Sequence, residues 1–229
     1  YDIYAIDLRG CGDAIIDNDI PHYIEDLTYY YQELDLLYDK FINKQLYEEI
    51  ILYGHSTGGL LAVIYYDYNI KNKNNQINKL ILNSPFFELN ENPVIKFIIK
   101  YIVYYISSFI PKKDISPNTG TPNDITEYIK NIYYTNPNKK SEKNIPVLPS
   151  WLSTVIFHQY RIQIGLINIE IPILVLTSDK TISTLNNNEI GDSVLDVESM
   201  YLYSKKLKSS PSNNNLTIES INDAIHDVL

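Results

Sequence analysis

A serine flanked by glycines lies between an apolar run and a helical pattern. The chain reads ILYGHSTGGLLA over residues 51–62, with the apolar run Ile50–Tyr53 before the serine and the helical pattern Thr57–Tyr68 after it. A direct turn from strand to helix is tight, so the residue at its apex, Ser56, has a strained backbone and an exposed hydroxyl. The two glycines leave room for the strand and the helix to approach each other. The pattern predicts a nucleophilic Ser56, and the alternative is an ordinary glycine-rich turn with a capping serine.

Apolar runs of strand length alternate with helical patterns along the chain. The runs that predict buried strands are Tyr4–Leu8, Ile50–Tyr53, Lys79–Leu82, Pro172–Leu176 and, more weakly, Leu216–Ile218. The helical patterns outside the middle of the chain are Tyr23–Ile42, Thr57–Tyr68 and Val197–Leu207. Continuous apolar strands that alternate with helices predict an α/β fold with a mostly parallel sheet and helices on both faces.

The segment 85–166 interrupts this alternation. It holds an apolar helical pattern at Val94–Ile110, a stretch rich in Pro and Asn, and a second helical pattern at Trp151–Ile164. A plain connection between neighbouring elements is much shorter than this. We therefore predict a core made of residues 1–84 and 167–229, with a helical cap inserted at 85–166.

A nucleophilic serine needs a base, and that base needs an orienting acid. Among four histidines, His226 follows the last predicted strand, where the chain order serine, acid, histidine places the base. His55 is next to the serine, so its side chain is expected to point elsewhere, and His22 and His158 are expected to be structural. The backbone N–H of Thr57 begins the predicted helix and can donate to a developing oxyanion.

Two aspartates follow the fourth apolar run and are candidates for the orienting acid. Asp179 stands at the end of that run, and Asp192 lies farther on, before the helical pattern Val197–Leu207. Aspartates in loops are mostly solvated. Residue type and position therefore leave both candidates open.

Charge and cysteine content restrict the partners. The chain has 229 residues and a net charge of −9, and a nucleic-acid binder normally carries a basic face, so no nucleic-acid partner is expected. The single cysteine, Cys11, excludes an internal disulfide and suits a reducing compartment, so a cytoplasmic location is expected. No metal or cofactor is expected, because the chain lacks His-Glu-x-x-His, a cysteine cluster and a complete dinucleotide loop.

The most apolar segment, Val94–Ile110, is interrupted by Lys96 and Lys100. A membrane-spanning helix needs about 20 apolar residues with few charges. We expect an amphipathic helix packed on the protein, and the alternative is contact with lipid or a lipid-like substrate through the cap.

Several segments resemble, in order, the α/β-hydrolases of the monoglyceride-lipase and lysophospholipase group. They are YDIYAIDLRGCG, LYGHSTGGLLA, LILNSPFF, IPILVLTSDKT, GDSVLDVESM and IHDVL. The resemblance implies an α/β-hydrolase fold and a serine hydrolase that cleaves small or lipid-like acyl esters. It also implies a triad of Ser56, His226 and Asp192, because Asp192 and Asp196 match a D-x-x-x-D spacing that often begins with the acid.

The sequence departs from the pattern of that family. Cys11 stands where a histidine is common, and the loop that supplies a second oxyanion donor before the Tyr4–Leu8 run is not present. The chain also starts at Tyr1 with Met200 as its only methionine, so we expect a piece of a longer protein. Without the third strand, Tyr4–Leu8 either leaves a gap or pairs directly with Ile50–Tyr53. The alternatives in function are a non-catalytic binding protein, or a peptidase, amidase or thioesterase on the same fold.

Overall fold

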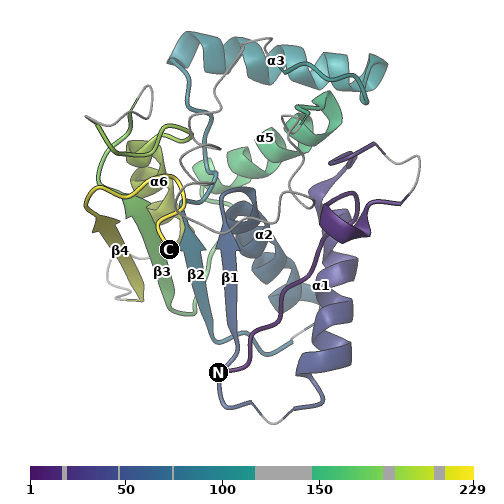
Figure 1. Ribbon diagram of the computed structural model, residues 1–229, viewed down its shortest axis with the longest axis vertical. Coiled ribbons are helices and arrows are strands. Elements are labelled where there is room, and N and C mark those ends of the chain that lie inside the picture. The colour runs from purple at the N-terminus through teal and green to yellow at the C-terminus, as the bar shows by residue number, and fades with distance from the viewer. Residues whose placement is uncertain (17–19, 46, 74, 117–145, 183–188, 209–214) are drawn as a thin grey trace. The chain divides into compact units, whose positions relative to one another are not determined.

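The computed structural model describes residues 1–16, 20–45, 47–73, 75–116, 146–182, 189–208 and 215–229 (Figure 1). The chain divides into two compact units. The first unit contains Tyr1–Gln45 and Phe97–Thr154, and the second unit contains Leu46–Lys96 and Val155–Leu229. The predicted cap at 85–166 stays a prediction, because residues 117–145 lie outside the described residues.

The second unit is built on a parallel sheet with the strand order β1-β2-β3-β4. The strands are β1 (Ile51–His55), β2 (Lys79–Asn83), β3 (Ile173–Ser178) and β4 (Leu216–Ile221). Figure 1 shows them side by side and pointing the same way. Each one confirms the strand predicted at an apolar run. Because the strands are parallel, the residues that follow them gather along one edge of the sheet.

The predicted strand at Tyr4–Leu8 is wrong. This segment of the first unit is irregular, and Tyr4 is exposed. An apolar run becomes a strand only where a neighbouring strand exchanges backbone hydrogen bonds with it. Among the described strands, β1 pairs with β2 alone, so the direct pairing of Tyr4–Leu8 with β1 does not form.

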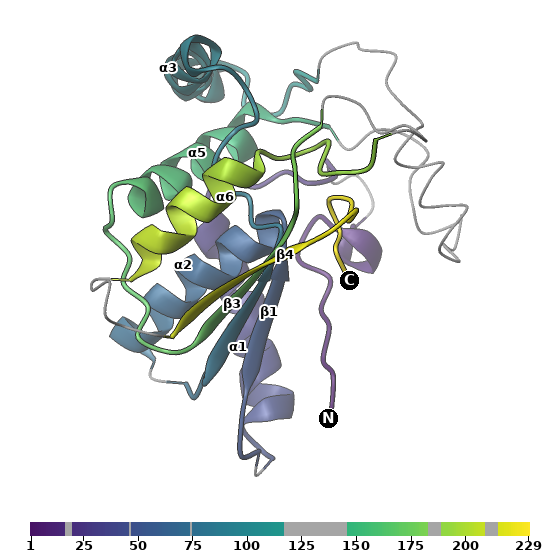
Figure 2. The ribbon, with the colours of Figure 1, turned by 90° about the vertical axis from the view of Figure 1, so that its left-hand side faces the viewer.

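Two helices of the second unit pack against the sheet. Helix α2 (Thr57–Asn72) contacts β1 and β2, and α6 (Val197–Ser204) contacts β3 and continues into the 3-10 turn η4 (Lys205–Leu207). Figure 2 shows α2 and α6 on the same side of the sheet. Helix α2 is buried without interruption from Gly59 to Asp67, which explains its continuous apolar sequence. The fully buried core side chains of this layer are Leu60, Val63, Ile64, Leu80, Leu82 and Val175.

The helical pattern Tyr23–Ile42 of the first unit forms helix from Leu27 onward. Its parts are the 3-10 helix η2 (Leu27–Tyr30), helix α1 (Tyr31–Leu37) and the π-helix η3 (Tyr38–Ile42), and a short 3-10 turn η1 (Gly12–Ala14) lies before them. The start is set by Asp26, whose carboxylate accepts a hydrogen bond of 2.9 Å from the N–H of Thr28. Such a cap satisfies a backbone donor that the first turn leaves open.

Helices α3 (Pro93–Phe109) and α5 (Pro149–Gln163) confirm the two helices predicted between Val94 and Ile164. Val103 is the buried residue of helix α3, and most of the other apolar side chains of this helix are exposed. No helix in the described ranges has both the length and the apolar character needed to cross a membrane.

Candidate active site

Ser56 occupies the turn between β1 and α2. Its backbone has φ 53° and ψ −119°, a left-handed conformation that is strained for a residue with a side chain. The Ser56 N–H donates to the carbonyl of Asn83 at 2.9 Å, and the Ser56 carbonyl accepts from Gly59 and Phe86, at 3.0 Å each. These backbone bonds hold the strained turn from both sides. The predicted strand–serine–helix geometry is therefore present.

The glycines around Ser56 differ in how much space a side chain would have at each position. A Cβ atom on Gly54 would lie 2.2 Å from the carbonyl oxygen of Gly58, and one on Gly59 would lie 2.9 Å from Cβ of Pro85. A Cβ atom on Gly58 would meet nothing within 4 Å. The close approach of β1 and α2 therefore requires glycine at positions 54 and 59, and the predicted need for glycine at position 58 is wrong.

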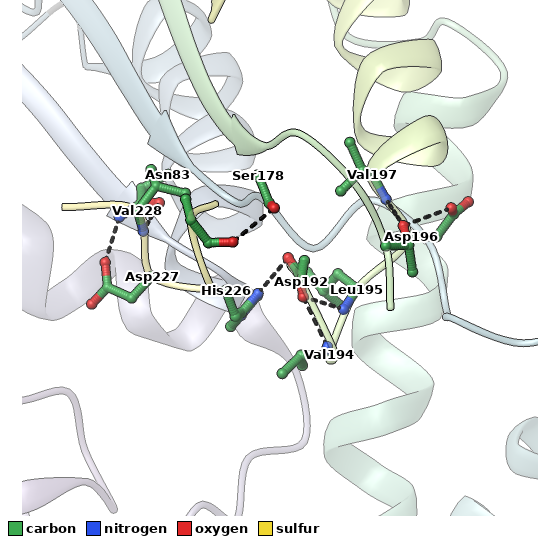
Figure 3. A network of polar contacts seen from close by, with 12 residues as sticks. Asn83, Ser178, Asp192, Val194, Leu195, Asp196, Val197, His226, Asp227 and Val228 are labelled. Carbon is green, nitrogen blue, oxygen red and sulfur yellow. Dashed lines mark hydrogen bonds and ion pairs between the residues drawn. The ribbon is translucent and has the colours of Figure 1, made fainter. Parts of the chain in front are cut away.

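His226 and Asp192 lie together, as Figure 3 shows. His226 Nδ1 is 2.9 Å from Asp192 Oδ2, with the Asp192 side chain fully buried and that of His226 13% exposed. The other carboxylate oxygen, Oδ1, accepts hydrogen bonds of 2.8 Å from the N–H groups of Val194 and Leu195. Both oxygens of the buried carboxylate are thus bonded, which offsets the cost of removing it from water.

The loop of Asp192 is attached to the segment that follows β3. The Asp192 N–H donates to the carbonyl of Lys180, and the Asp192 carbonyl accepts from the N–H of Ile182, both at 2.9 Å. A Cβ atom on Gly191 would lie 2.8 Å from the Lys180 carbonyl oxygen, so this close approach needs a glycine. The loop path therefore places Asp192 next to His226.

Asp179, the other candidate acid, is exposed and has different partners. Its Oδ1 accepts a hydrogen bond of 3.2 Å from the Asp223 N–H and lies 3.4 Å from Ser178 Oγ. Asp179 therefore holds the start of the loop that carries His226. The structure brings Asp192, and not Asp179, into contact with the His226 imidazole.

The His55 side chain, expected to point away from Ser56, contacts the same loop that carries His226. Its ring centroid is 4.9 Å from that of His226, and its Nε2 is 3.3 Å from the His226 carbonyl oxygen. Burial, and then the neighbouring imidazole of His226, hold the pKa of His55 below its usual 6.5. Because Ser56 directly follows His55, the serine and the histidine loop occupy the same edge of the sheet. Among the described residues, no hydrogen bond joins Ser56 to His226.

The remaining predicted residues lie as follows. Thr57 is the first residue of α2, and helix starts present N–H groups that have no acceptor within the helix. His158 is buried in α5, with Nδ1 3.3 Å from Nη1 of Arg161. His22 belongs to the first unit, where its Nδ1 is 3.5 Å from Sγ of Cys11. Within the described part of the chain, no three His, Cys, Asp or Glu side chains gather in a way that could hold a metal ion.

A family model described as serine aminopeptidase, S33, matches residues 1–229. The chain belongs to this family. The sequence resemblance to α/β-hydrolases and the predicted fold class are both confirmed. No curated protein matches the sequence of this family member.

Solved structures of low sequence identity share the fold of this S33-family chain. A monoacylglycerol lipase from Paleococcus ferrophilus is 17% identical with a TM-score of 0.60, over 98% of this chain and 74% of the lipase. A soluble variant of monoglyceride lipase from Saccharomyces cerevisiae is 14% identical with a TM-score of 0.62, over 96% and 68%. A thermostable carboxyl esterase from Bacillus coagulans is 14% identical with a TM-score of 0.61, over 94% and 70%.

Proposed function

We propose that the protein is a serine hydrolase that cleaves carboxylic esters of small or lipid-like acyl groups. One observation carries the proposal: Asp192, fully buried, lies 2.9 Å from His226 Nδ1, and the backbone of His226 contacts the residue that precedes Ser56. A histidine paired with a buried acid, near a serine on a strained turn, is the arrangement that acyl transfer uses. The S33 family membership supports the same class of chemistry.

In the proposed reaction, Ser56 Oγ attacks the ester carbonyl carbon while His226 Nε2 takes the hydroxyl proton. Asp192 keeps the other proton on His226 Nδ1 and so selects the tautomer that accepts at Nε2. The Thr57 N–H donates to the oxyanion of the tetrahedral intermediate. The alcohol leaves with the proton from His226, and the acyl group stays on Ser56. Water attacks this acyl-enzyme by the same route and releases the acid.

The lipid-like part of the proposal is supported by α3. Seven apolar side chains on this helix are more than half exposed, and its only charged residues are Lys96 and Lys100. The exposed set is Val94, Phe97, Tyr101, Ile102, Tyr104, Tyr105 and Phe109. A helix with this composition suits a lipid surface or a lipid-like substrate. We expect Phe97→Ser with Phe109→Ser to reduce binding to anionic vesicles and to leave hydrolysis of a water-soluble ester unchanged.

A second candidate function is cleavage of an amide or thioester. The family description names an aminopeptidase, and the same catalytic groups cleave all three kinds of acyl bond. A matched panel with one acyl group as ester, thioester and anilide separates the candidates. Preference for the ester supports the proposal, and faster cleavage of an aminoacyl anilide would assign the chain to the peptidases.

The test of the proposal is labelling by a fluorophosphonate probe, compared between the wild type, Ser56→Ala and Ser84→Ala. Ser84 is the matched control because it also has a positive φ, 42°, after a strand, but it is fully buried. We expect Ser56→Ala to abolish labelling and to lower ester hydrolysis about 10⁴–10⁶-fold, with Ser84→Ala still labelled. Labelling that survives Ser56→Ala would refute the nucleophile. A folded wild type that binds acyl compounds without labelling would support the non-catalytic alternative.

A further inference from the structure

The backbone on both sides of His226 is held by side chains at the ends of neighbouring strands. Ser178, the last residue of β3, donates through Oγ to the carbonyl of Ala224 at 2.8 Å. Asn83, the last residue of β2, bonds to the two residues that follow His226. Figure 3 shows these contacts around the loop.

The Asn83 side chain is fully buried, and both its oxygen and its nitrogen are bonded. Nδ2 donates to Asp227 Oδ1 at 2.7 Å and to the hydroxyl of Tyr53 at 2.9 Å. Oδ1 accepts from the Val228 N–H at 3.3 Å. A carboxamide is suited to this position because it supplies two donors and an acceptor in one plane.

The same residue also holds the serine turn. The backbone carbonyl of Asn83 accepts the N–H of Ser56 at 2.9 Å, while its side chain holds the residues after His226. Among the described contacts, neither Asn83 nor Asp227 contacts the His226 imidazole. Asp192 therefore holds the proton on His226 Nδ1. Asn83 holds the backbone that follows His226. We propose that Asn83 is a positioning residue that sets the distance between His226 and Ser56. This inference rests on the proposed function.

The expected kinetic effect follows from the sensitivity of proton transfer to distance. A displacement of about 1 Å between reacting groups costs about 10²-fold in rate. Loss of the Asn83 side chain should therefore lower kcat by about 10- to 100-fold and leave KM nearly unchanged, because the acyl group does not bind to Asn83 in the proposed reaction. It should slow fluorophosphonate labelling by the same factor.

A reciprocal exchange separates positioning from structure. Asn83→Asp places two carboxylates opposite each other and should lower kcat about as much as Asn83→Ala. Adding Asp227→Asn restores a hydrogen bond between an amide and a carboxylate, with the donor now at position 227 and the acceptor at position 83. The Val228 N–H can still donate to the side chain at position 83. The Tyr53 hydroxyl can turn to donate to the new carboxylate. We expect the double variant to regain most of the kcat that Asn83→Asp loses.

The matched control is Asn69→Ala. Asn69 is also buried in the second unit and holds a loop, with Nδ2 2.7 Å from the Asn75 carbonyl and Oδ1 3.0 Å from the Asn75 N–H. Asn69→Ala should lower the denaturation midpoint and leave kcat unchanged. If it lowers kcat as much as Asn83→Ala at equal loss of stability, Asn83 is merely structural and the inference is overturned.

Kinetics and proton NMR are measured together on the full chain, so that the inference and the proposed function can fail separately. The low-field resonance of the His226 Nδ1–H, assigned by its loss in Asp192→Asn, should shift or broaden in Asn83→Asp and return in the double variant. An inactive, unlabelled wild type with this NMR pattern refutes the hydrolase function and supports the positioning role. If the wild type is active, two results refute the positioning role. One is a double variant that stays as slow as Asn83→Asp. The other is an Asn83→Asp variant with unchanged kcat and an unchanged His226 resonance.

Discussion

His226 Nδ1 lies 2.9 Å from Oδ2 of Asp192, although 34 residues separate them in the chain. The other oxygen of Asp192 is already committed to two backbone N–H groups of its own loop. The orientation of the carboxyl group is therefore fixed independently of the histidine. An asparagine at position 192 would keep its oxygen on those N–H groups and turn its NH₂ toward His226.

The first prediction compares Asp192→Asn with Asp179→Asn. An NH₂ group that faces His226 Nδ1 favours the tautomer with the proton on Nε2, which cannot accept the serine proton. We expect Asp192→Asn to lower kcat by about 10³–10⁴-fold. Asp179→Asn should change kcat by less than about 10-fold, because an amide oxygen can still accept from Asp223. Steady-state ester hydrolysis measures both, and equal rates would contradict the choice of Asp192.

The second prediction compares Gly54→Ala with Gly58→Ala. The new Cβ atom at position 54 would lie 2.2 Å from a backbone oxygen, so β1 and α2 would have to separate. We expect Gly54→Ala to lower the free energy of unfolding by about 2 kcal/mol or more. Gly58→Ala has open space and lies in a helix, so it should leave that free energy unchanged or raise it by up to about 1 kcal/mol. Denaturant unfolding measures both, and equal effects would contradict the steric argument.

The sequence predicted best the inner strands of the sheet, which are covered by neighbouring strands. Lys79–Leu82 and Pro172–Leu176 are mostly apolar runs, and they form the inner strands β2 and β3, each of which has a neighbouring strand on both sides. Tyr4–Leu8 is also a mostly apolar run, but the strand predicted there does not form, because composition does not say whether a partner strand is adjacent. A segment forms a strand only with a partner strand beside it, and the local sequence does not show whether that partner is there.

The candidate site likewise contains residues that the sequence predicted and residues that it did not. The turn at Ser56 was predictable because strand, glycine and helix are contiguous in the sequence. The choice between Asp179 and Asp192 depended on the path of a loop, and the residues alone left it open. Asn83 had no sequence signal at all, since its bond to Asp227 spans 144 residues and follows no periodic pattern.

The third prediction concerns the buried carboxylate of Asp67 in α2. It accepts from Arg161 Nη2 of α5 at 2.9 Å and from Lys71 Nζ at 2.5 Å, and the Asp67 side chain is 5% exposed. We expect Arg161→Met to lower the free energy of unfolding by about 2–4 kcal/mol, because it removes the better buried partner of a buried charge. Lys71→Met should cost less than about 1 kcal/mol, since the Lys71 side chain is 56% exposed. Similar losses in denaturant unfolding would contradict the assignment of Arg161 as the main partner.

The fourth prediction concerns the pH dependence of stability at His55. Burial and the neighbouring His226 hold the pKa of His55 below 6.5, its ordinary value. As the pH falls through 6.5, the unfolded chain therefore takes up a proton at His55 before the folded chain does. Proton uptake by the unfolded state alone lowers the free energy of unfolding, so stability is retained above pH 6.5 and lost below it.

The test compares the wild type with His55→Gln by denaturant unfolding at about pH 7.5 and about pH 5.5. The variant has no titrating group at position 55, so its stability should fall less between the two pH values than that of the wild type. His22, whose pKa is also lowered by burial, titrates in both proteins and cancels in the comparison. His22→Gln serves as the matched control in the first unit. An equal loss of stability in the wild type and His55→Gln would mean that His55 is protonated alike in the folded and unfolded chains.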